Sequence, residues 1–343
     1  MTLSAIASIV AADGNGTGEA LRRARVLHAQ GTGPATRESG TPFDVPAWAF
    51  PVVIPGTTVP SVPNDSVTQQ HVPHSAAAYT QLRARDRFDV VDWHPETHKP
   101  APNVVVHGRK PGMMACGFCH LPDGMGRPEN AMIAGLRDDY IVAQVEEMKS
   151  HQRGSASPTP FPPTVAMRLI ADSVSHAELV EAARYFAKVR ARRESRVIES
   201  DSVPKFIPLN GLSTLLPGGG REALGDRLVE AAVDLRRHEL HDPMAEYVAY
   251  VPRGSLARGR ALAAGDPRHG VKGCTSCHGP DLRGVQLVPP IAGRSPSYLL
   301  RQLIGFRTGA RNGATSAPMH DVVATMSIQD MVAAAAYAGS RTP

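Results

Sequence analysis

Apolar side chains recur at helical spacing in two stretches that lie far apart in the chain. The positions are Ile141, Val145, Met148, Leu299, Leu303 and Phe306. Intervals of three and four residues place such side chains on one face of an α-helix. The pattern therefore predicts one amphipathic helix in each stretch, with its apolar face packed against a core.

The two predicted helices belong to an internal repeat. A shift of 158 residues aligns the run Ile133-Ala134-Gly135 with the run Ile291-Ala292-Gly293. The tyrosine and the glutamine that follow also match, and these pairs are Tyr140 with Tyr298 and Gln144 with Gln302. The chain is therefore predicted to contain a duplicated helical domain.

The repeat resumes beyond a loop, with a shift of 152 residues. There Met167 aligns with Met319, and Ser175 aligns with Ser327. Each serine precedes an alanine-rich stretch and is followed, three residues later, by an acidic residue. A serine N-cap combined with an acidic side chain in the first turn is typical of the start of a helix. We therefore expect a helix to begin after each serine.

Length and composition narrow the class of protein. A chain of 343 residues suits two domains, and its 30 prolines and 31 glycines indicate long loops between compact helical parts. No apolar run reaches the length of about 18 residues that a transmembrane helix needs. The net charge is +5, but basic and acidic residues are interspersed, so the sequence predicts no nucleic-acid-binding surface.

All four cysteines fall in two Cys-x-x-Cys-His units. They are Cys116, Cys119 and His120 in the first unit, and Cys274, Cys277 and His278 in the second. One helical turn presents both thiols to the vinyl groups of a haem, and the adjacent histidine binds the iron. A shared zinc site and a thioredoxin-like redox pair are the alternatives, which the wide separation and the missing βαβ pattern disfavour. The sequence thus predicts two covalently attached haem c groups.

Two methionines are the candidates for the distal iron ligands. Met167 and Met319 occupy the same place in the repeat, each before its last helix. The methionines that compete for the first haem are Met113, Met114, Met125, Met132 and Met148. A thioether is a soft, neutral ligand that favours ferrous iron. Pro122 and Pro280 are predicted to lie beside the carbonyl that fixes each proximal imidazole, and to end each attachment helix.

With these motifs, the sequence resembles the class I c-type cytochromes, in particular the two-domain dihaem cytochromes of the c4 and c553-like type. The resemblance covers about 108–190 and 254–340. It implies an all-α fold around each haem, histidine–methionine ligation and one-electron transfer between redox proteins. The spacing from histidine to methionine is longer in the first half than in the second, which departs from the small c4 pattern.

The predicted organisation has four parts. A proline-rich N-terminal arm spans 1–74, and its apolar stretch at 3–12 resembles the end of a signal peptide. The first cytochrome c domain spans 75–195. The second spans 254–343 and begins with a helix at about Ser255–Ala264. The connecting segment 196–253 is predicted to be irregular or helical, with a helix between Gly220 and about Arg237.

The stretch between 75 and 107 carries weaker signals. Residues 75–86 are predicted to form a short helix. His94, His98 and His107 lie close in sequence, but the prolines between them give no shared helical face. We interpret these side chains as solvated loop histidines rather than as a metal site.

The leading hypothesis is a dihaem electron carrier, or the cytochrome subunit of a dehydrogenase. Its partners would be other redox proteins, such as a dehydrogenase, a cytochrome or an oxidase. Covalent haem attachment implies maturation outside the bacterial cytoplasm, and hence a periplasmic location. The alternative is a dihaem peroxidase-like oxidoreductase with an open distal site on haem 1, where the loop is longer. The sequence leaves the two reduction potentials and their order open.

Overall fold

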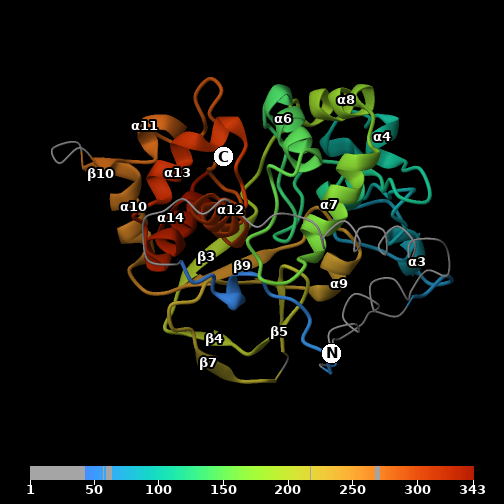
Figure 1. Cartoon of the computed structure of the whole chain (residues 1–343). Helices are drawn as coiled ribbons and strands as arrows, with labels where there is room; N and C mark the ends of the chain where they lie inside the picture. The colour runs from blue at the N-terminus through green and yellow to red at the C-terminus, as the bar shows by residue number, and fades with distance from the viewer. Residues whose placement is uncertain (1–42, 57, 59–63, 217, 267–270) are drawn as a thin grey trace.

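Two groups of helices lie next to each other over a small β-sheet in the folded chain (Figure 1). A computed structural model describes residues 43–343 apart from 57, 59–63, 217 and 267–270. The apolar stretch at 3–12 and much of the predicted arm lie outside the described residues. Within the described part of the chain, no helix has the length and apolar character needed to cross a membrane.

The first group of helices comes from residues 103–186. Its members are α4 (Asn103–Val106), α5 (Cys116–His120), α6 (Asp138–Lys149), α7 (Pro162–Ser173) and α8 (His176–Phe186). Helix α6 packs against α7 and α8, and Ile141, Val145 and Phe186 are buried between them. The helix predicted from the apolar spacing in this half is therefore confirmed as α6.

The second group repeats this arrangement. Its members are α10 (Ser255–Ala264), β10 (Gly265–Asp266), β11 (Val271–Lys272), α11 (Thr275–His278), α12 (Pro296–Thr308), η4 (Ala314–Ser316), α13 (Ala317–Val323) and α14 (Ile328–Ser340). The entry helix and the helix predicted around Leu303 are confirmed as α10 and α12. Helix α10 crosses α14 at close range, with the buried Gly259 at the crossing. In the first half a single turn, α4, precedes the attachment unit and packs against α8, as α6 also does.

The connecting segment forms a β-sheet. Its strands are β3 (Ser195–Glu199), β5 (Phe206–Pro208), β6 (Ser213–Leu215), β8 (Val229–Ala232) and β9 (Tyr247–Val251), in the order β3-β9-β8-β6-β5. The pairs β3–β9 and β6–β8 are parallel, and the other two are antiparallel. Strands β4 (Ser202–Pro204) and β7 (Arg221–Ala223) pair separately.

The sheet corrects two sequence-based expectations. The predicted all-α fold is not confirmed. The prediction that the connecting segment 196–253 is irregular or helical is wrong, because it forms strands. The predicted helix up to Arg237 is replaced by β7, β8 and the short α9 (Leu235–Glu239). Strands form here because the apolar side chains of β8 and β9, such as Val229 and Val248, are buried while α12 and α14 pack against the sheet.

The N-terminal part of the described chain is largely irregular. Its short elements are η1 (Ala47–Ala49), β1 (Gln69–Gln70), β2 (Tyr79–Thr80), α3 (Gln81–Ala84) and η2 (Pro95–Thr97). The helix predicted over 75–86 is thus reduced to the four residues of α3. Phe50 is buried with its ring centroid 5.5 Å from that of Phe161, so this segment contributes to the core shared with the second half.

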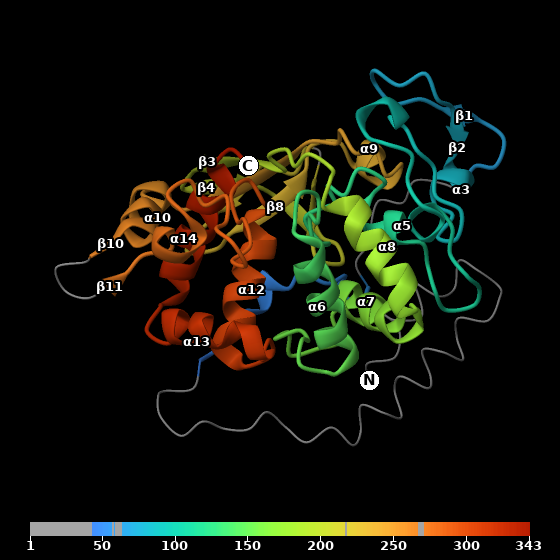
Figure 2. The same cartoon turned by 90° about the horizontal axis from the view of Figure 1, so that it is seen from above.

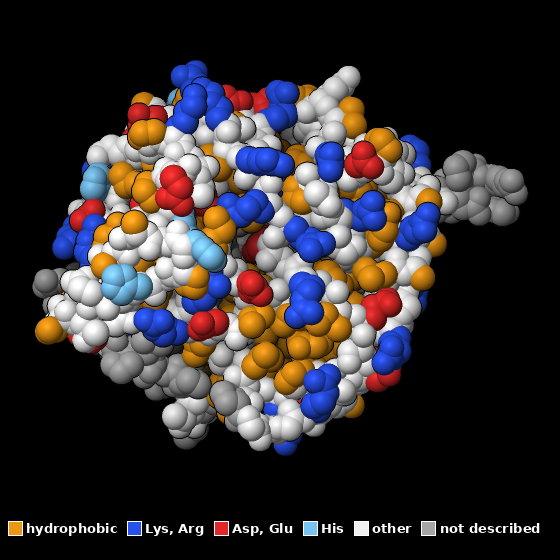
Figure 3. All heavy atoms as spheres, turned by 180° about the vertical axis from the view of Figure 1, so that it is seen from behind, with side chains coloured by type: hydrophobic (Ala, Val, Ile, Leu, Met, Phe, Trp, Pro, Cys, Tyr) orange, Lys and Arg blue, Asp and Glu red, His pale blue; other side chains and the backbone are white. Residues whose placement is uncertain are grey.

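Charged side chains are interspersed on the surface that Figure 3 shows. Lysines and arginines lie among aspartates and glutamates there, and apolar side chains lie between them. This distribution agrees with the mixed charge pattern along the sequence. That face therefore carries no extended surface of one charge.

Both predicted N-caps are confirmed as complete capping boxes. The Ser175 hydroxyl accepts from the Glu178 backbone N–H, and Ser327 does the same with Asp330. We expect Ser175→Ala and Ser327→Ala each to lower the free energy of unfolding by about 1 kcal/mol, because one helix-terminal N–H loses its partner. Urea denaturation of the holoprotein measures this difference. An unchanged transition midpoint in both variants would contradict the assignment of the caps.

Candidate functional site

The first Cys-x-x-Cys-His unit forms the one-turn helix α5 at the wall of a cavity. Cys116, Cys119 and His120 all line this cavity, which we call cavity 1. The His120 Nδ1 atom lies 2.8 Å from the Ala131 carbonyl oxygen, which accepts its hydrogen bond. Burial lowers the pKa of His120, so its imidazole is neutral. Nε2 is therefore the nitrogen available to bind iron.

The second unit has the same geometry. Cys274 precedes α11, and His278 ends it. The His278 Nδ1 atom lies 2.8 Å from the carbonyl oxygen of Pro289, the repeat equivalent of Ala131. Burial again lowers the pKa of the imidazole. Both units thus present a neutral histidine held through Nδ1, which is how a proximal haem ligand is oriented.

The prediction that a carbonyl beside Pro122 or Pro280 accepts the hydrogen bond of the proximal imidazole is wrong. Both imidazoles bond to carbonyls eleven residues beyond the histidine. The Pro122 carbonyl instead accepts a hydrogen bond of 2.7 Å from the Tyr185 hydroxyl. The residues that follow the two attachment helices are Leu121 and Gly279, whose φ angles are 61° and 83°. These left-handed residues turn the chain, so the returning loop supplies the acceptor.

The two candidate distal methionines lie in equivalent helices. Met167 belongs to α7, which begins at Pro162 and so takes in the end of the proline-rich stretch. Met167 lines cavity 1 together with Cys116 and His120. Met319 belongs to α13 and packs, like Cys274, against the core of the second half. Each methionine therefore lies in the half that carries its own attachment unit.

One competing methionine also reaches cavity 1. Met148, on α6, lines it as well. Its repeat equivalent is Phe306, which has no sulfur to offer. Met113, Met125 and Met132 are buried in core clusters and do not line the cavity. The repeat therefore favours Met167 over Met148 as the ligand that both halves share.

Comparisons with known proteins decide the family. No family model matches the chain. A cytochrome c4 of Azotobacter vinelandii is 26% identical over 226 residues, which is 65% of this chain and 82% of that protein. Cytochrome c-554(548) of Halomonas halodenitrificans is 34% identical over 80 residues, 23% of this chain and 94% of the relative.

The chain belongs to the class I c-type cytochromes. It is a dihaem member that carries two haem c groups with iron and transfers electrons. A further relative, the thiosulfate dehydrogenase electron acceptor of Thiomonas intermedia, is 24% identical over 219 residues, 63% of this chain and 73% of that protein.

Solved structures resemble this cytochrome only loosely. A thiosulfate dehydrogenase of Marichromatium purpuratum aligns with a TM-score of 0.44 and 26% identity over 67% of this chain, which spans 37% of that protein. Cytochrome c4 of Pseudomonas stutzeri aligns with a TM-score of 0.42 and 22% identity, over 66% of this chain and 93% of the other.

Cavity 1 suits a haem because it combines apolar walls with buried guanidinium groups. Arg153, Arg301 and Arg311 line it, and each is buried. Among the described residues, no carboxylate lies within ion-pair distance of any of the three. Burying a cation without an anionic partner is energetically unfavourable, so such a site is expected to bind an anion. The propionates of a haem supply that charge.

The cysteines do not fit the zinc or thioredoxin-like alternatives. Burial raises the pKa of Cys116 to about 12, and it also raises the pKa of Cys274. Metal-binding and redox-active cysteines require the opposite, a thiolate favoured at neutral pH. Within the part of the chain that the structure describes, no three His, Cys, Asp or Glu side chains are grouped to hold a metal ion.

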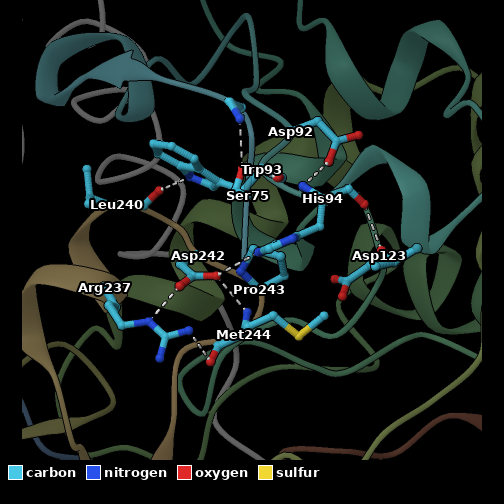
Figure 4. Close-up of polar contacts among 12 residues, drawn as sticks. Ser75, Asp92, Trp93, His94, Asp123, Arg237, Leu240, Asp242, Pro243 and Met244 are labelled. Atoms are coloured by element: carbon cyan, nitrogen blue, oxygen red, sulfur yellow. Dashed lines mark hydrogen bonds and ion pairs between the residues drawn. The ribbon is translucent and has the colours of Figure 1, made fainter. Parts of the chain in front are cut away.

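Residues outside the helical halves cover the first attachment unit of this cytochrome. We call residues 72–94 and 235–247 the haem-1 cap. Its two parts are joined by hydrogen bonds, including one of 2.7 Å from Trp93 Nε1 to the Leu240 carbonyl (Figure 4). Arg192 then links the cap to the attachment loop, because it donates to both Asp123 and the Pro243 carbonyl.

Two of the three predicted loop histidines are buried, so their interpretation as solvated side chains is wrong for both. His94 lies inside the cap, with Nε2 3.6 Å from Asp242 Oδ1. His98 lies 2.8 Å from the Tyr185 hydroxyl. Glu96 and Asp92 contact these imidazoles from nearby in the sequence. The sequence did not show the burial, because Asp242 beside His94 and Tyr185 beside His98 come from segments more than 80 residues away.

The cap makes the two attachment units unequal. Phe118, inside the first unit, lies against His241 of the cap with ring centroids 4.6 Å apart. Arg127 and Glu129, beyond that unit, are largely buried and form an ion pair of 3.0 Å. Their repeat equivalents are Val285 and Leu287, whose side chains are 47% and 70% exposed. The second unit therefore has an open apolar rim where the first has a covered one.

Proposed function

We propose that this dihaem cytochrome carries single electrons between periplasmic redox proteins and exchanges them with its partners at haem 2. The haem iron supplies the chemistry by alternating between the ferric and ferrous states. The observation that carries the proposal is the difference between the two rims, of which only that of the second unit is exposed. The periplasmic location is proposed because covalent haem attachment requires maturation outside the cytoplasm.

We assign the site residues by their equivalent positions in the two halves. Cys116 and Cys119 would form the thioether bonds to haem 1, with His120 and Met167 as its axial ligands. The corresponding residues for haem 2 are Cys274, Cys277, His278 and Met319. The position of Met167 at cavity 1 supports a closed distal side, and so favours a carrier over the peroxidase-like alternative.

We name the surface around the second unit the haem-2 face. It comprises Cys277, which is exposed, together with Val285 and Leu287. Apolar side chains around an exposed redox centre suit a brief encounter through a small interface. The relatives named thiosulfate dehydrogenase electron acceptor support a dehydrogenase as the electron donor. The acceptor would be another cytochrome or an oxidase.

The variant Leu287→Glu tests this function. We expect the second-order rate of electron transfer from the reduced protein to a small blue-copper protein to fall about tenfold. The physical reason is that a carboxylate in an apolar contact must lose its water, and about 1.4 kcal/mol of docking free energy corresponds to tenfold. Stopped-flow absorbance measures this rate.

The matched control is Val67→Glu, which places the same charge on an 82% exposed side chain of the N-terminal irregular part. It should leave the rate unchanged. Oxidation by ferricyanide, a small ion that needs no protein interface, should be similar in all three proteins and shows that the haems are intact. A rate reduced by Val67→Glu and not by Leu287→Glu would show that the exchange face is not the haem-2 face.

A further inference from the structure

The boundary between the two halves is built from equivalent residues that cross over. Arg153 and Arg311, which are related by the 158-residue shift, pair as an antiparallel β-bridge. Arg153 donates 3.0 Å to the Tyr298 hydroxyl, and Arg311 donates 2.8 Å to the Tyr140 hydroxyl. Each arginine thus bonds to the tyrosine of the opposite half. Figure 2 shows α6 and α12, which carry these tyrosines, side by side.

Cavity 1 is completed by the second half of the chain. Tyr298, Arg301, Gln302 and Arg311 all line it, although they follow the second attachment unit in sequence. The Nε atom of Arg311 is buried and has no hydrogen-bond partner among the described residues. Arg153 and Arg311 are equivalent in the repeat, so this pair is not a difference in sequence between the two halves.

Arg301 is different because its contribution is not duplicated. It projects from α12 of the second half to the wall of cavity 1, where it is 6% exposed. The repeat equivalent of Arg301 is Ala143, so α6 provides no such cation to the second site. Position 301 therefore gives the first site a guanidinium group that the equivalent position 143 does not give the second.

The charge of Arg301 is not cancelled by a direct partner. Its guanidinium donates to two backbone carbonyls, those of Gly211 and Pro128. Glu129 also lines cavity 1, but its carboxylate is paired with Arg127 at 3.0 Å. An arginine side chain stays protonated even when buried. A full positive charge therefore faces cavity 1 from a site with little solvent.

We infer that haem 1 has the higher reduction potential of the two and that Arg301 is the residue that raises it. A nearby cation disfavours the ferric state, which carries one more positive charge than the ferrous state. The haem-1 cap acts in the same direction, because excluding water also penalises the more highly charged state. This inference rests on the proposed ligands and on the proposed electron-transfer function.

Potentiometric titration of the holoprotein tests the inference. The far-red methionine-to-ferric-haem band reports haem 1 alone in a Met319→His background, and haem 2 alone in a Met167→His background. We expect the first midpoint to be higher than the second. Arg301→Gln should lower the haem 1 reduction equilibrium constant about tenfold, which is 59 mV for one electron, and should leave haem 2 nearly unchanged.

Two further results keep the outcomes distinct. Arg301→Lys retains the charge and should restore most of the midpoint, which a purely structural role would not predict. If the Arg301→Gln variant does not form a holoprotein, the order of the two midpoint potentials still tests the inference. A lower midpoint potential at haem 1 than at haem 2 overturns it. An equal shift of both haems by Arg301→Gln would overturn it as well. Loss of the far-red band in both histidine backgrounds would instead refute the ligand assignment.

Discussion

Replacement of Met319 by alanine is expected to remove about half of the far-red absorption band of the oxidised protein. Met167→Ala is expected to remove the other half, because each methionine is proposed to ligate one of two haems. Loss of a thioether ligand also removes its preference for ferrous iron, so the affected potential should fall by on the order of tenths of a volt. Absorption spectroscopy and redox titration of the two single variants measure both effects.

Met148→Leu is the matched control for the first haem. Met148 lines the same cavity as Met167, but its repeat equivalent is Phe306. The control should retain the full band and both potentials. If Met148→Leu removed half of the band while Met167→Ala did not, Met148 would be the distal ligand of haem 1. The repeat would then differ between its two halves at that position.

Gly259→Val is expected to destabilise the second half by about 3 kcal/mol or more. A Cβ atom at this position would lie 2.6 Å from the Tyr337 Cβ atom and closer still to the Ala333 carbonyl oxygen. Both contacts belong to α14, so the two helices must move apart to admit a side chain. Thermal or urea unfolding, followed by haem absorption, measures the loss of stability.

Ala261→Val is the control, because it adds a β-branched residue to an exposed position of the same helix. The expected loss of stability there is about 0.5 kcal/mol, because only the lower helix propensity of valine contributes. A similar loss of stability in both variants would show that the helix itself, rather than its crossing with α14, limits the stability.

Local sequence signals predicted the helical halves well. The serine caps at Ser175 and Ser327 and the entry helix at 255–264 depend on side chains within a few residues of one another, so the sequence contains their whole cause. The two haem c groups followed from the attachment units for the same reason. These features do not require knowledge of distant segments.

The sheet and the haem-1 cap depend on distant partners. Strand β3 pairs with β9, and Ser195 is 52 residues before its register partner Tyr247. Each strand is three to five residues long, which is too short for alternation to distinguish it from a loop or a helix turn. The cap likewise joins Trp93 to Leu240. Only the folded chain brings these segments together.

The boundary arginines were missed, although the sequence does contain a signal for them. Arg153 and Arg311 obey the same 158-residue shift that identified Tyr140 and Gln144. A match in a loop between two helices carries no periodicity, so it has no obvious role until the bridge is seen. Extending the repeat comparison to every polar position would have found the pair.

The crossed boundary restricts how the two copies of the domain can diverge. Gln144 Oε1 accepts hydrogen bonds from Arg153 at 2.8 Å and from Arg311 at 2.5 Å, and Gln302 contacts the same two guanidinium groups. A substitution in one copy therefore disturbs partners in both. A substitution at a boundary position of one copy must be compensated in the other copy, so homologous sequences should show covariation between the two copies at these positions. Within the described part of the chain, the residues of the two rims make no such shared contacts and should vary independently.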